Sequence, residues 1–535
     1  MTLKRIVAAT FTVAWLTGCM TVGPDYRRPK VDTPEQWSGA ASTEPIRADW
    51  WKAYGDPVLE RMVGDALAYN TDLRLAIARV DEARAALGIS RADQRPGVSA
   101  NAGASRNRAS QESVLPIPPD IDPEYSNYRA TLNASYEIDF WGKYRRATEA
   151  ARAELLAAQS NREAVRITLI TDVARGYFNL RALDAQVAVT RRTIATRLAS
   201  TALQRMRFEA GVASDFDLRQ VEAQTAQAQA LLPGLERSLA QQETALAVLL
   251  GHSPRAIVTL QVERGAAIEA LTVPPAVPSG LPSEILERRP DVRQAEQQLI
   301  AANARIGQAK AEYYPSISLT AFLGGDSASL SDLFSASARV WQVGGSAAQT
   351  IFDAGRTGQQ VEQARAREQQ LLARYASVIQ NAFKDTLDAL VAQRTAREAL
   401  EAEQARVTAL QSSYRLAQLR YDNGVSSLLD VLDVERGLLD AELNRVEAQR
   451  AQLAATADLF KAEDNSTMAS CAARASNLFG AVTKGKPVSS AIFFATNTSY
   501  PFGVFNPVPT AVPPNASSRT ASSAFLIARM LLSIC

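Results

Sequence analysis

Apolar and polar residues alternate with a period of two in two segments of the chain, and this pattern predicts β-strands with one apolar and one polar face. The apolar positions are Tyr128, Ala130, Leu132, Ala134, Tyr136, Ile138 and Phe140 in one segment and Trp341, Val343, Ala347 and Ile351 in the other. A weaker alternation precedes each segment. We therefore expect strands at about residues 98–108, 127–140, 316–323 and 339–352.

Long stretches rich in Ala, Arg, Glu, Gln and Leu predict helices over most of the remaining chain. The two longest, residues 143–208 and 356–421, contain no proline. Shorter helices are predicted before each strand pair and after each long helix, over residues 72–94, 214–250, 291–313 and 427–462. Pro233 falls inside one of these, and we expect it to bend that helix rather than end it.

Several motifs occur twice in the same order, which indicates an internal duplication. The recurring pairs are Thr71-Asp72-Leu73-Arg74 with Pro290-Asp291-Val292-Arg293, Gly142-Lys143 with Gly355-Arg356, and Arg207-Phe208-Glu209-Ala210-Gly211-Val212 with Arg420-Tyr421-Asp422-Asn423-Gly424-Val425. We expect repeat 1 over residues 58–250 and repeat 2 over residues 283–462. Each repeat has the order helix, two strands, very long helix, turn, helix.

The amino terminus has the pattern of a secretory signal, because Lys4 and Arg5 precede a short apolar run. The run ends in Leu16-Thr17-Gly18-Cys19, which resembles a bacterial lipoprotein signal with Cys19 as the lipidated residue. The alternative is an ordinary cleavable signal with a chance cysteine. We expect a signal peptide over residues 1–18. Residues 19–57 and 251–282 are weakly periodic and Pro-rich, and we expect them to be linkers around the middle of the helices.

Charge and composition exclude several function classes. Lys plus Arg total 58 against 56 for Asp plus Glu, so no strongly basic surface is available for nucleic acid. The single histidine, His252, has no acidic partner nearby in the sequence, and the three cysteines are far apart. No nucleophile, metal cluster or phosphate loop is visible. We therefore expect no catalytic site, no metal and no cofactor.

Strands of about ten residues with one apolar face are typical of outer-membrane proteins, since hydrocarbon satisfies no open backbone group. A soluble β-sandwich has similar strands, and the lipoprotein signal favours the membrane. Four strands are too few to close a barrel around a pore, for which about eight is the minimum. If the strands cross the membrane, the chain must oligomerise, and three copies would supply twelve strands.

Further motifs resemble those of the TolC-like outer-membrane efflux proteins, in particular their lipoprotein branch of the OprM or NodT type. They include Glu287-Arg288-Arg289-Pro290-Asp291-Val292-Arg293, Tyr314-Pro315-Ser316-Ile317-Ser318-Leu319-Thr320, Thr21-Val22-Gly23-Pro24-Asp25-Tyr26, Tyr136-Glu137-Ile138-Asp139-Phe140-Trp141-Gly142 and Ile351-Phe352-Asp353-Ala354-Gly355-Arg356. The resemblance implies a mainly α fold with membrane β: a homotrimer whose twelve-stranded outer-membrane β-barrel continues into a twelve-helix periplasmic α-barrel. It also implies passive export of small molecules, together with a periplasmic adaptor and an inner-membrane pump of the resistance-nodulation-division type.

The turns at the far ends of the long helices are the candidate docking sites for the adaptor. Gly211 and Gly424 can end one helix, and the Ser-x-x-Asp patterns that follow can begin the next. A tight turn between antiparallel helices explains these residues equally well. By the resemblance, the candidate docking residues are Arg207, Gly211, Val212, Ser214, Arg420, Gly424, Val425 and Ser427.

The resemblance also implies a constriction of the tunnel one or two helical turns from the same ends. The gate candidates are Tyr414, Leu416, Gln418 and Asp422. Tyr414 and Leu416 are two positions apart and cannot point the same way on a helix, so one of them is expected to be ordinary packing.

Two further points complete the expectations. The rival function is a lipid-anchored periplasmic coiled-coil adaptor or scaffold, which would carry one helical hairpin rather than a duplicated unit. Residues 463–535 differ sharply in composition from the rest of the chain, with few charged residues and no visible period. We interpret them as a frameshifted or read-through terminus, with an accessory domain as the alternative.

Overall fold

The computed structural model describes residues 21–32, 49–110, 112, 122–259, 261–274 and 288–463. All of them belong to one compact unit, residues 1–471. The predicted signal peptide, Cys19 and residues 464–535 of the predicted tail lie outside the described residues.

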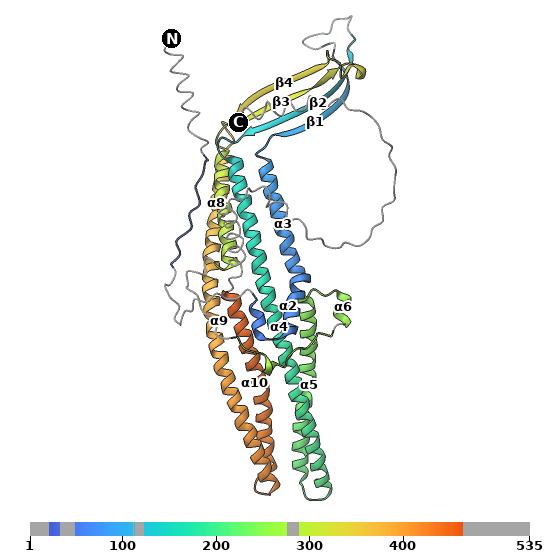
Figure 1. The fold of residues 1–535 in the computed structure, drawn as a ribbon, viewed down its shortest axis with the longest axis vertical. Coiled ribbons are helices and arrows are strands. Elements are labelled where there is room, and N and C mark those ends of the chain that lie inside the picture. The colour runs from blue at the N-terminus through green and yellow to red at the C-terminus, as the bar shows by residue number, and fades with distance from the viewer. Residues whose placement is uncertain are drawn as a thin grey trace, which may run out of the picture. The chain divides into compact units, whose positions relative to one another are not determined.

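Helices and strands follow one another in an order that occurs twice along the chain (Figure 1). The first half contains η1 (Trp50–Tyr54), α2 (Pro57–Tyr69), α3 (Thr71–Ala92), β1 (Gly97–Arg108), β2 (Glu124–Ile138), α4 (Lys143–Glu209) and α5 (Asp215–Leu249). The second contains α6 (Pro254–Thr259), η2 (Ile268–Ala270), α8 (Pro290–Ala311), β3 (Ser316–Ser327), η3 (Leu330–Asp332), β4 (Arg339–Ala348), α9 (Arg356–Asp422) and α10 (Leu428–Glu463). The short helices η1, α2, α6, η2 and η3 were not expected from the sequence. α5 continues through Pro233.

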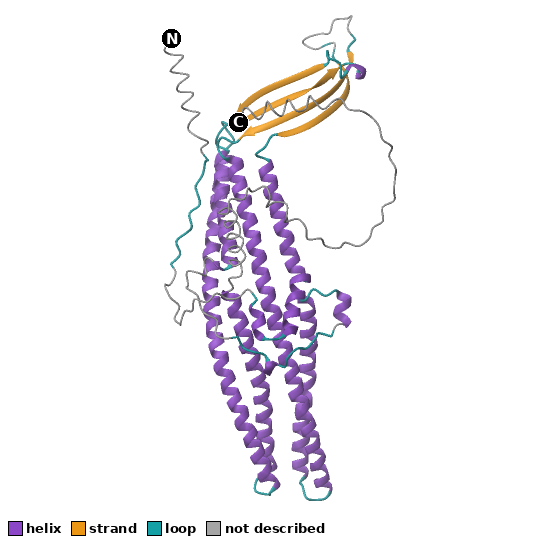
Figure 2. Ribbon diagram, viewed as in Figure 1, coloured by secondary structure: helices purple, strands orange, loops and turns teal. Residues whose placement is uncertain are grey.

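The four strands form one antiparallel sheet in the order β1-β2-β3-β4 (Figure 2). The register aligns apolar positions with apolar positions: Ala100 pairs with Leu132, Leu132 with Leu323, and Leu323 with Trp341. The neighbouring rows are mostly polar, as where Ser135 pairs with Thr320. The sheet therefore has one apolar and one mostly polar face, in agreement with the period-two pattern.

Two strands end earlier than the alternation predicts. β2 ends at Ile138 and β4 at Ala348, so Phe140 and Ile351 lie outside the sheet, and the predicted bounds 127–140 and 339–352 are wrong at this end.

An aspartate in each of these segments explains why the strand stops. Asp139 Oδ2 accepts the backbone N–H of Arg145 at 2.9 Å, and Asp353 Oδ2 accepts the backbone N–H of Thr357 at 2.8 Å. Side-chain acceptors of this kind satisfy the open N–H groups of a first helical turn. β2 and β4 therefore end a few residues before α4 and α9 begin.

Four helices lie side by side in the order α3, α4, α8, α9, and they extend away from the sheet (Figure 1). Further from the sheet, α5 packs on α4, and α10 packs on both α4 and α9. None of the helices in the described ranges combines the length and the apolar character that crossing a membrane requires.

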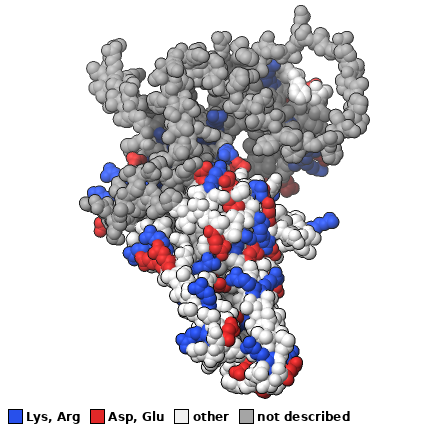
Figure 3. All heavy atoms as spheres, turned by 60° about the horizontal axis from the view of Figure 1, so that its bottom comes forward, with Lys and Arg blue, Asp and Glu red and all other residues white. Residues whose placement is uncertain are grey.

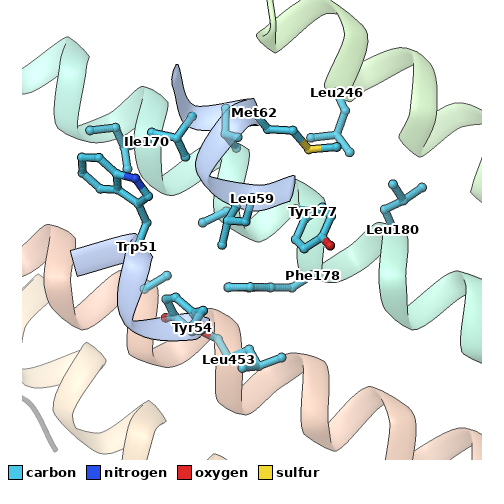
Figure 4. Close-up of a cluster of buried hydrophobic side chains, with 14 of the residues drawn as sticks. Trp51, Tyr54, Leu59, Met62, Ile170, Tyr177, Phe178, Leu180, Leu246 and Leu453 are labelled. Atoms are coloured by element: carbon cyan, nitrogen blue, oxygen red, sulfur yellow. The ribbon is translucent and has the colours of Figure 1, made fainter. Parts of the chain in front are cut away.

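The main hydrophobic core surrounds the middle of α4 (Figure 4). Phe178 of α4 meets Tyr54 of η1, with ring centroids 4.8 Å apart, and Trp50 stacks on Phe460 of α10 at 4.9 Å. Ile268 of η2 is also fully buried. η1 and η2, which lie in the segments expected to be linkers, thus belong to the core, because their aromatic and aliphatic side chains fill the space between α4, α5 and α10.

A buried carboxylate joins three parts of this core. Asp56 Oδ1 accepts the backbone N–H of Val58 at 2.8 Å and caps α2. Its Oδ2 accepts the hydroxyl of Tyr177 at 2.5 Å and the backbone N–H of Ala266 at 2.9 Å. Asp56 is fully buried. These three hydrogen bonds therefore offset the free-energy cost of removing its carboxylate from water.

Residues 21–32 form a strap along the helices. A Cβ on Gly23 would lie 2.4 Å from the Cα of Gly307, so only glycine permits this approach. The N–H of Val22 donates to the carbonyl of Trp141 at 3.0 Å, and the Arg146 guanidinium lies 2.8 Å from Asp25. The strap is therefore fixed at the joint between strands and helices.

Trp141 packs within the same joint. Its indole N–H donates to the carbonyl of Pro315 at 2.9 Å, and its ring stacks on Tyr314 with centroids 4.6 Å apart. Trp341, by contrast, is exposed on the apolar face of the sheet.

Candidate docking and gating site at the helical turns

Two turns lie at the end of the helices that is furthest from the sheet, one between α4 and α5 and one between α9 and α10 (Figure 1). Gly211 and Gly424 adopt φ values of 73° and 75°. This left-handed conformation is strained for other residues. A Cβ at either position would meet no atom within 4 Å, so the requirement for glycine comes from the backbone and not from crowding.

Both turns are closed by the same backbone hydrogen bonds. The N–H of Val212 donates to the carbonyl of Arg207 at 2.9 Å, and the N–H of Val425 donates to the carbonyl of Arg420 at 2.8 Å. These bonds satisfy carbonyl groups at the end of each long helix in the manner of a Schellman motif.

The Ser-x-x-Asp patterns act as helix starts. The N–H of Asp217 donates to Ser214 Oγ at 3.1 Å, and the N–H of Asp430 donates to Ser427 Oγ at 3.3 Å. Ser427 N–H also donates to the Asp430 carboxylate at 3.1 Å, which completes a reciprocal cap.

Large apolar side chains are exposed at both turns. Val212 is 75% exposed and Val425 is 65% exposed, and each is followed by a second exposed apolar residue, Phe216 at 68% and Leu429 at 57%. Sequence reasoning missed Phe216 and Leu429, although they hold the same place after their respective turns. We call these four residues the turn patches. They expose apolar surface next to the first turns of α5 and α10.

A contact between the two hairpins lies just inside the turns. The hydroxyl of Tyr421 on α9 accepts hydrogen bonds from Gln204 Nε2 at 2.6 Å and from the Arg207 guanidinium at 3.1 Å, both on α4. The guanidinium also lies 5.7 Å from the centre of the Tyr421 ring. Arg207, expected to face a partner, therefore has its charged group directed at the neighbouring hairpin instead, whereas Arg420 is exposed.

The gate candidates are not brought together as one cluster. Gln418 Nε2 donates to Asp422 Oδ1 at 3.1 Å, and Leu416 is exposed. Tyr414 is half-buried, and burial followed by the charge of Glu435 raises the pKa of its hydroxyl. Tyr414 and Leu416 thus lie in different surroundings, as their spacing requires.

A buried ion pair lies near Tyr414. Arg197 of α4, only 2% exposed, places its Nε 3.2 Å from Glu435 of α10 and donates from its NH1 to the carbonyl of Gln224 on α5 at 2.6 Å. The sequence pattern did not identify this pair, since nothing local connects residues so far apart.

Positive and negative side chains are interspersed over the end of the helices that carries the turns, with uncharged surface between them (Figure 3). A partner at this end would therefore meet a mixed surface rather than a field of one sign.

Comparison with known proteins identifies the family. The sequence profile of the family described as outer membrane efflux protein matches residues 62–252 and 281–463. The chain belongs to this family. The matched segments correspond closely to the two predicted repeats, residues 58–250 and 283–462.

Relatives among the outer membrane efflux proteins cover nearly the whole described chain. A probable efflux pump outer membrane protein of Pseudomonas putida, TtgC, is 34% identical over 468 residues, which cover 86% of this chain and 95% of TtgC. The probable outer membrane lipoprotein SilC of Salmonella typhimurium is 32% identical, with 84% and 96% coverage. The crystal structure of the CmeC outer membrane channel of Campylobacter jejuni superposes with a TM-score of 0.79 at 25% identity, covering 83% of this chain and 95% of CmeC.

These similarities establish the general role of the chain. It is an outer-membrane component of an efflux system, and it extends from the outer membrane into the periplasm. Members of the family are channels rather than enzymes.

Proposed function

We propose that three copies of this chain form a passive export channel, with a twelve-stranded β-barrel in the outer membrane above a twelve-helix barrel in the periplasm. The observation that carries the proposal is the open sheet. Among the described residues, β1 and β4 each have only one neighbouring strand. In hydrocarbon, the unpaired N–H and C=O groups of both edges would each cost several kcal/mol.

The strand directions fit closure by identical copies. All three strand pairs are antiparallel, so β4 runs opposite to β1. The edge β4 of one copy can therefore pair antiparallel with the edge β1 of the next, and three copies supply twelve strands, which exceeds the practical minimum of about eight. The apolar face of such a ring would contact lipid and the mostly polar face would line the pore.

The proposed internal duplication supports the periplasmic part. α3 and α4 in one half correspond to α8 and α9 in the other, and these four helices lie side by side. Three copies would thus contribute twelve helices to one barrel.

The helical turns are the proposed contact with a periplasmic adaptor protein. Their turn patches are exposed, their geometry is repeated in both hairpins, and no described part of the chain covers them. The hydrogen bonds of Tyr421 would hold the two hairpins together in the closed channel, and separation of the hairpins would open it. Gln418 and Asp422, which contact each other, are the proposed gate residues beside this contact.

An inner-membrane pump of the resistance-nodulation-division type would supply the energy, because the chain itself is a passive conduit. We propose in addition that Cys19 carries a lipid anchor. The leader pattern supports this, and SilC is named a probable lipoprotein. Two or more acyl chains on one residue would give stable membrane attachment.

The proposal is tested by combining the mass of the detergent-solubilised protein with single-channel conductance in lipid bilayers. A trimeric mass and discrete conductance steps are expected. A stably monomeric protein that is soluble in water after removal of its lipid would contradict the assembly.

Adaptor docking is tested separately with Gly211→Glu/Gly424→Glu. We expect this double variant to abolish efflux while trimers still assemble, because it places charge and backbone strain at both turns. Thr244→Glu, an exposed position on α5, is the control and should keep efflux. Normal efflux by the double variant would mean that the turns are not the docking site.

A further inference from the structure

A cavity of about 460 Å³ is shared by α3, α4, α8 and α9. Its charged lining residues are Arg79 of α3, Glu154 of α4, Arg305 of α8, and Arg367 and Arg374 of α9. Because the four helices lie side by side, a depression lined by all of them marks the concave side of this layer of helices.

The strap of residues 21–32 marks the opposite side. The Tyr26 hydroxyl donates to Glu296 at 3.2 Å, and the Arg28 guanidinium lies 2.9 Å from the same carboxylate. Glu296 is two positions from both Gln294 and Gln298, which line the cavity. At 3.6 residues per turn, two positions correspond to a rotation of about 200° around the helix. In the proposed trimer, the strap would thus cover the outside and the cavity would face the tunnel.

The charge on the cavity wall is strongly unequal. Glu154 is neutralised by its ion pair with Arg305. Arg79, Arg367 and Arg374 are exposed, and none of them forms an ion pair with a carboxylate of the described residues. Three uncompensated guanidinium groups per copy therefore project from one concave surface.

We propose that these arginines form an anion-binding zone in the part of the tunnel nearest the sheet and give the channel a preference for anionic solutes. A narrow passage lined by one sign of charge raises the local concentration of the opposite ion. Guanidinium groups bind carboxylate, phosphate and sulfate groups with two parallel hydrogen bonds, so solutes carrying such groups are the expected class. The inference rests on the proposed trimeric channel, which would repeat the cluster around the axis.

Acidic lining residues belong to separate depressions, one with Asp72 and Asp172 and one with Asp385. Along α9, Asp385 lies about 16 Å from Arg374, which is beyond the Debye length at 0.1 M salt. Along α4, Asp172 lies about 27 Å from Glu154, more than twice the Debye length of about 10 Å at 0.1 M salt. Asp72 is closer to Arg79, about 10 Å along α3. The two arginines of α9 are therefore the better test of the cluster.

The test compares Arg367→Gln/Arg374→Gln with the control Arg74→Gln/Arg152→Gln, which removes two exposed arginines that form no ion pair among the described residues. Arg74 is five positions from Arg79, and Arg152 is two positions from Glu154, so both point away from the cavity by at least about 140°. Each protein is reconstituted in planar bilayers, and the zero-current potential is measured across a potassium chloride gradient near 0.1 M.

We expect the wild type and the control to prefer chloride, and the α9 variant to lose roughly threefold in the ratio of chloride to potassium permeability. Inorganic triphosphate should reduce the chloride current of the wild type but not that of the variant, and the block should disappear near 1 M salt, where the Debye length is about 3 Å. Arg367→Lys/Arg374→Lys keeps the charge and should keep the preference.

Two results would overturn the inference while leaving the channel intact: a wild type that conducts without anion preference, as when carboxylates of a neighbouring copy neutralise the cluster, or equal loss of preference in the control. Absence of any conductance together with a monomeric mass would instead reject the proposed channel. If the glutamine variant fails to assemble, the triphosphate block of the wild type and its salt dependence still decide the question.

Discussion

At the scale of single residues, one tyrosine hydroxyl holds the two helical hairpins together near their turns. Tyr421 accepts hydrogen bonds from Gln204 and from the charged Arg207, and it has the same place in the second repeat that Phe208 has in the first. A hydrogen bond from a charged donor contributes about 1.5–3 kcal/mol. One oxygen atom therefore accounts for much of the polar contact at this point.

Tyr421→Phe is expected to weaken the closed state while the trimer persists, because it removes both acceptor contacts and keeps the ring. The measurements are closed-state conductance in bilayers and entry of a large antibiotic into cells, and both should rise. Ser413→Ala, which removes a hydroxyl at an exposed position on the same helix, is the control and should leave both unchanged. No increase in the Tyr421→Phe variant would show that the contact does not restrain the tunnel.

A second residue-scale prediction concerns Tyr177. Burial, followed by the hydrogen bond to Asp56, raises the pKa of its hydroxyl above the ordinary value of 10.0. The folded protein thus favours the neutral hydroxyl, so its stabilising contribution is complete below pH 10 and is lost as the pH rises through the raised pKa.

Thermal unfolding of the wild type should accordingly occur at lower temperature as the pH rises above 10. Tyr177→Phe should be less stable near neutral pH, because Asp56 loses a buried partner, and its stability should fall less steeply in the alkaline range. Identical alkaline slopes in both proteins would contradict this role of Tyr177.

At the scale of elements, three ion pairs of the described residues join α4 and α10, and two of them differ strongly in burial. Arg197 with Glu435 is buried, with side chains 3% and 11% exposed, whereas the Arg192 side chain in the pair with Glu442 is 65% exposed. Removing one member of a buried pair costs about 3–5 kcal/mol because the other charge is left without a partner, while an exposed pair contributes about 0–1 kcal/mol.

Arg197→Met should therefore lower the thermal stability of the purified protein markedly, and Arg192→Met should change it little. The two variants make the same substitution on the same helix against the same partner helix. Equal effects would mean that burial does not determine the contribution of these pairs.

At the scale of the whole molecule, the proposed barrel requires the apolar face of the sheet to contact lipid and the mostly polar face to line the pore. Val343 and Gln342 are neighbours on β4, and the register places Val343 in an apolar row with Ala321 and Gln342 in a row with Asn133 and Phe322. A lipid-facing position near the middle of the bilayer penalises arginine by about 2–4 kcal/mol, whereas a pore-facing position does not.

Val343→Arg should reduce the amount of assembled protein in the outer membrane, and Gln342→Arg should not. The measurement is the amount of trimer in isolated outer membranes at equal expression. The reverse order would place the polar face toward lipid and contradict the proposed barrel.

The sequence allowed the regular elements to be predicted well and the contacts between them poorly. Periodicity and composition depend on neighbouring residues, so the long helices begin and end within about a residue of the expected positions. The pairs Arg197–Glu435 and Tyr421–Gln204 join residues that are remote in sequence, and no local pattern marks them. The sequence did hold one sign of the Tyr421 contact. Tyr421 stands where the first repeat has Phe208, and the additional hydroxyl can form a polar contact.

The core contribution of η1 and η2 was missed for a related reason. Pro-rich, weakly periodic segments are typical of linkers, yet Trp50 and Ile268 are buried by partners on α4 and α10. The ends of two strands were predicted too late because the apolar alternation does not show which residues cap the next helix. The carboxylates of Asp139 and Asp353 accept backbone N–H groups in the first turns of α4 and α9, and the strands end before them.

The glycine contact between Gly23 and Gly307 has a consequence for depth in the bilayer. Thr21, the first described residue of the strap, is only two residues from Cys19, and two residues of extended chain reach about 7 Å. If Cys19 carries the proposed lipid anchor, its fatty acids would enter the leaflet beside Trp141, whose carbonyl accepts the N–H of Val22. The periplasmic surface of the outer membrane would then be level with the base of the strands. The anchor would therefore attach the protein to the membrane and also determine how deeply its strands are inserted.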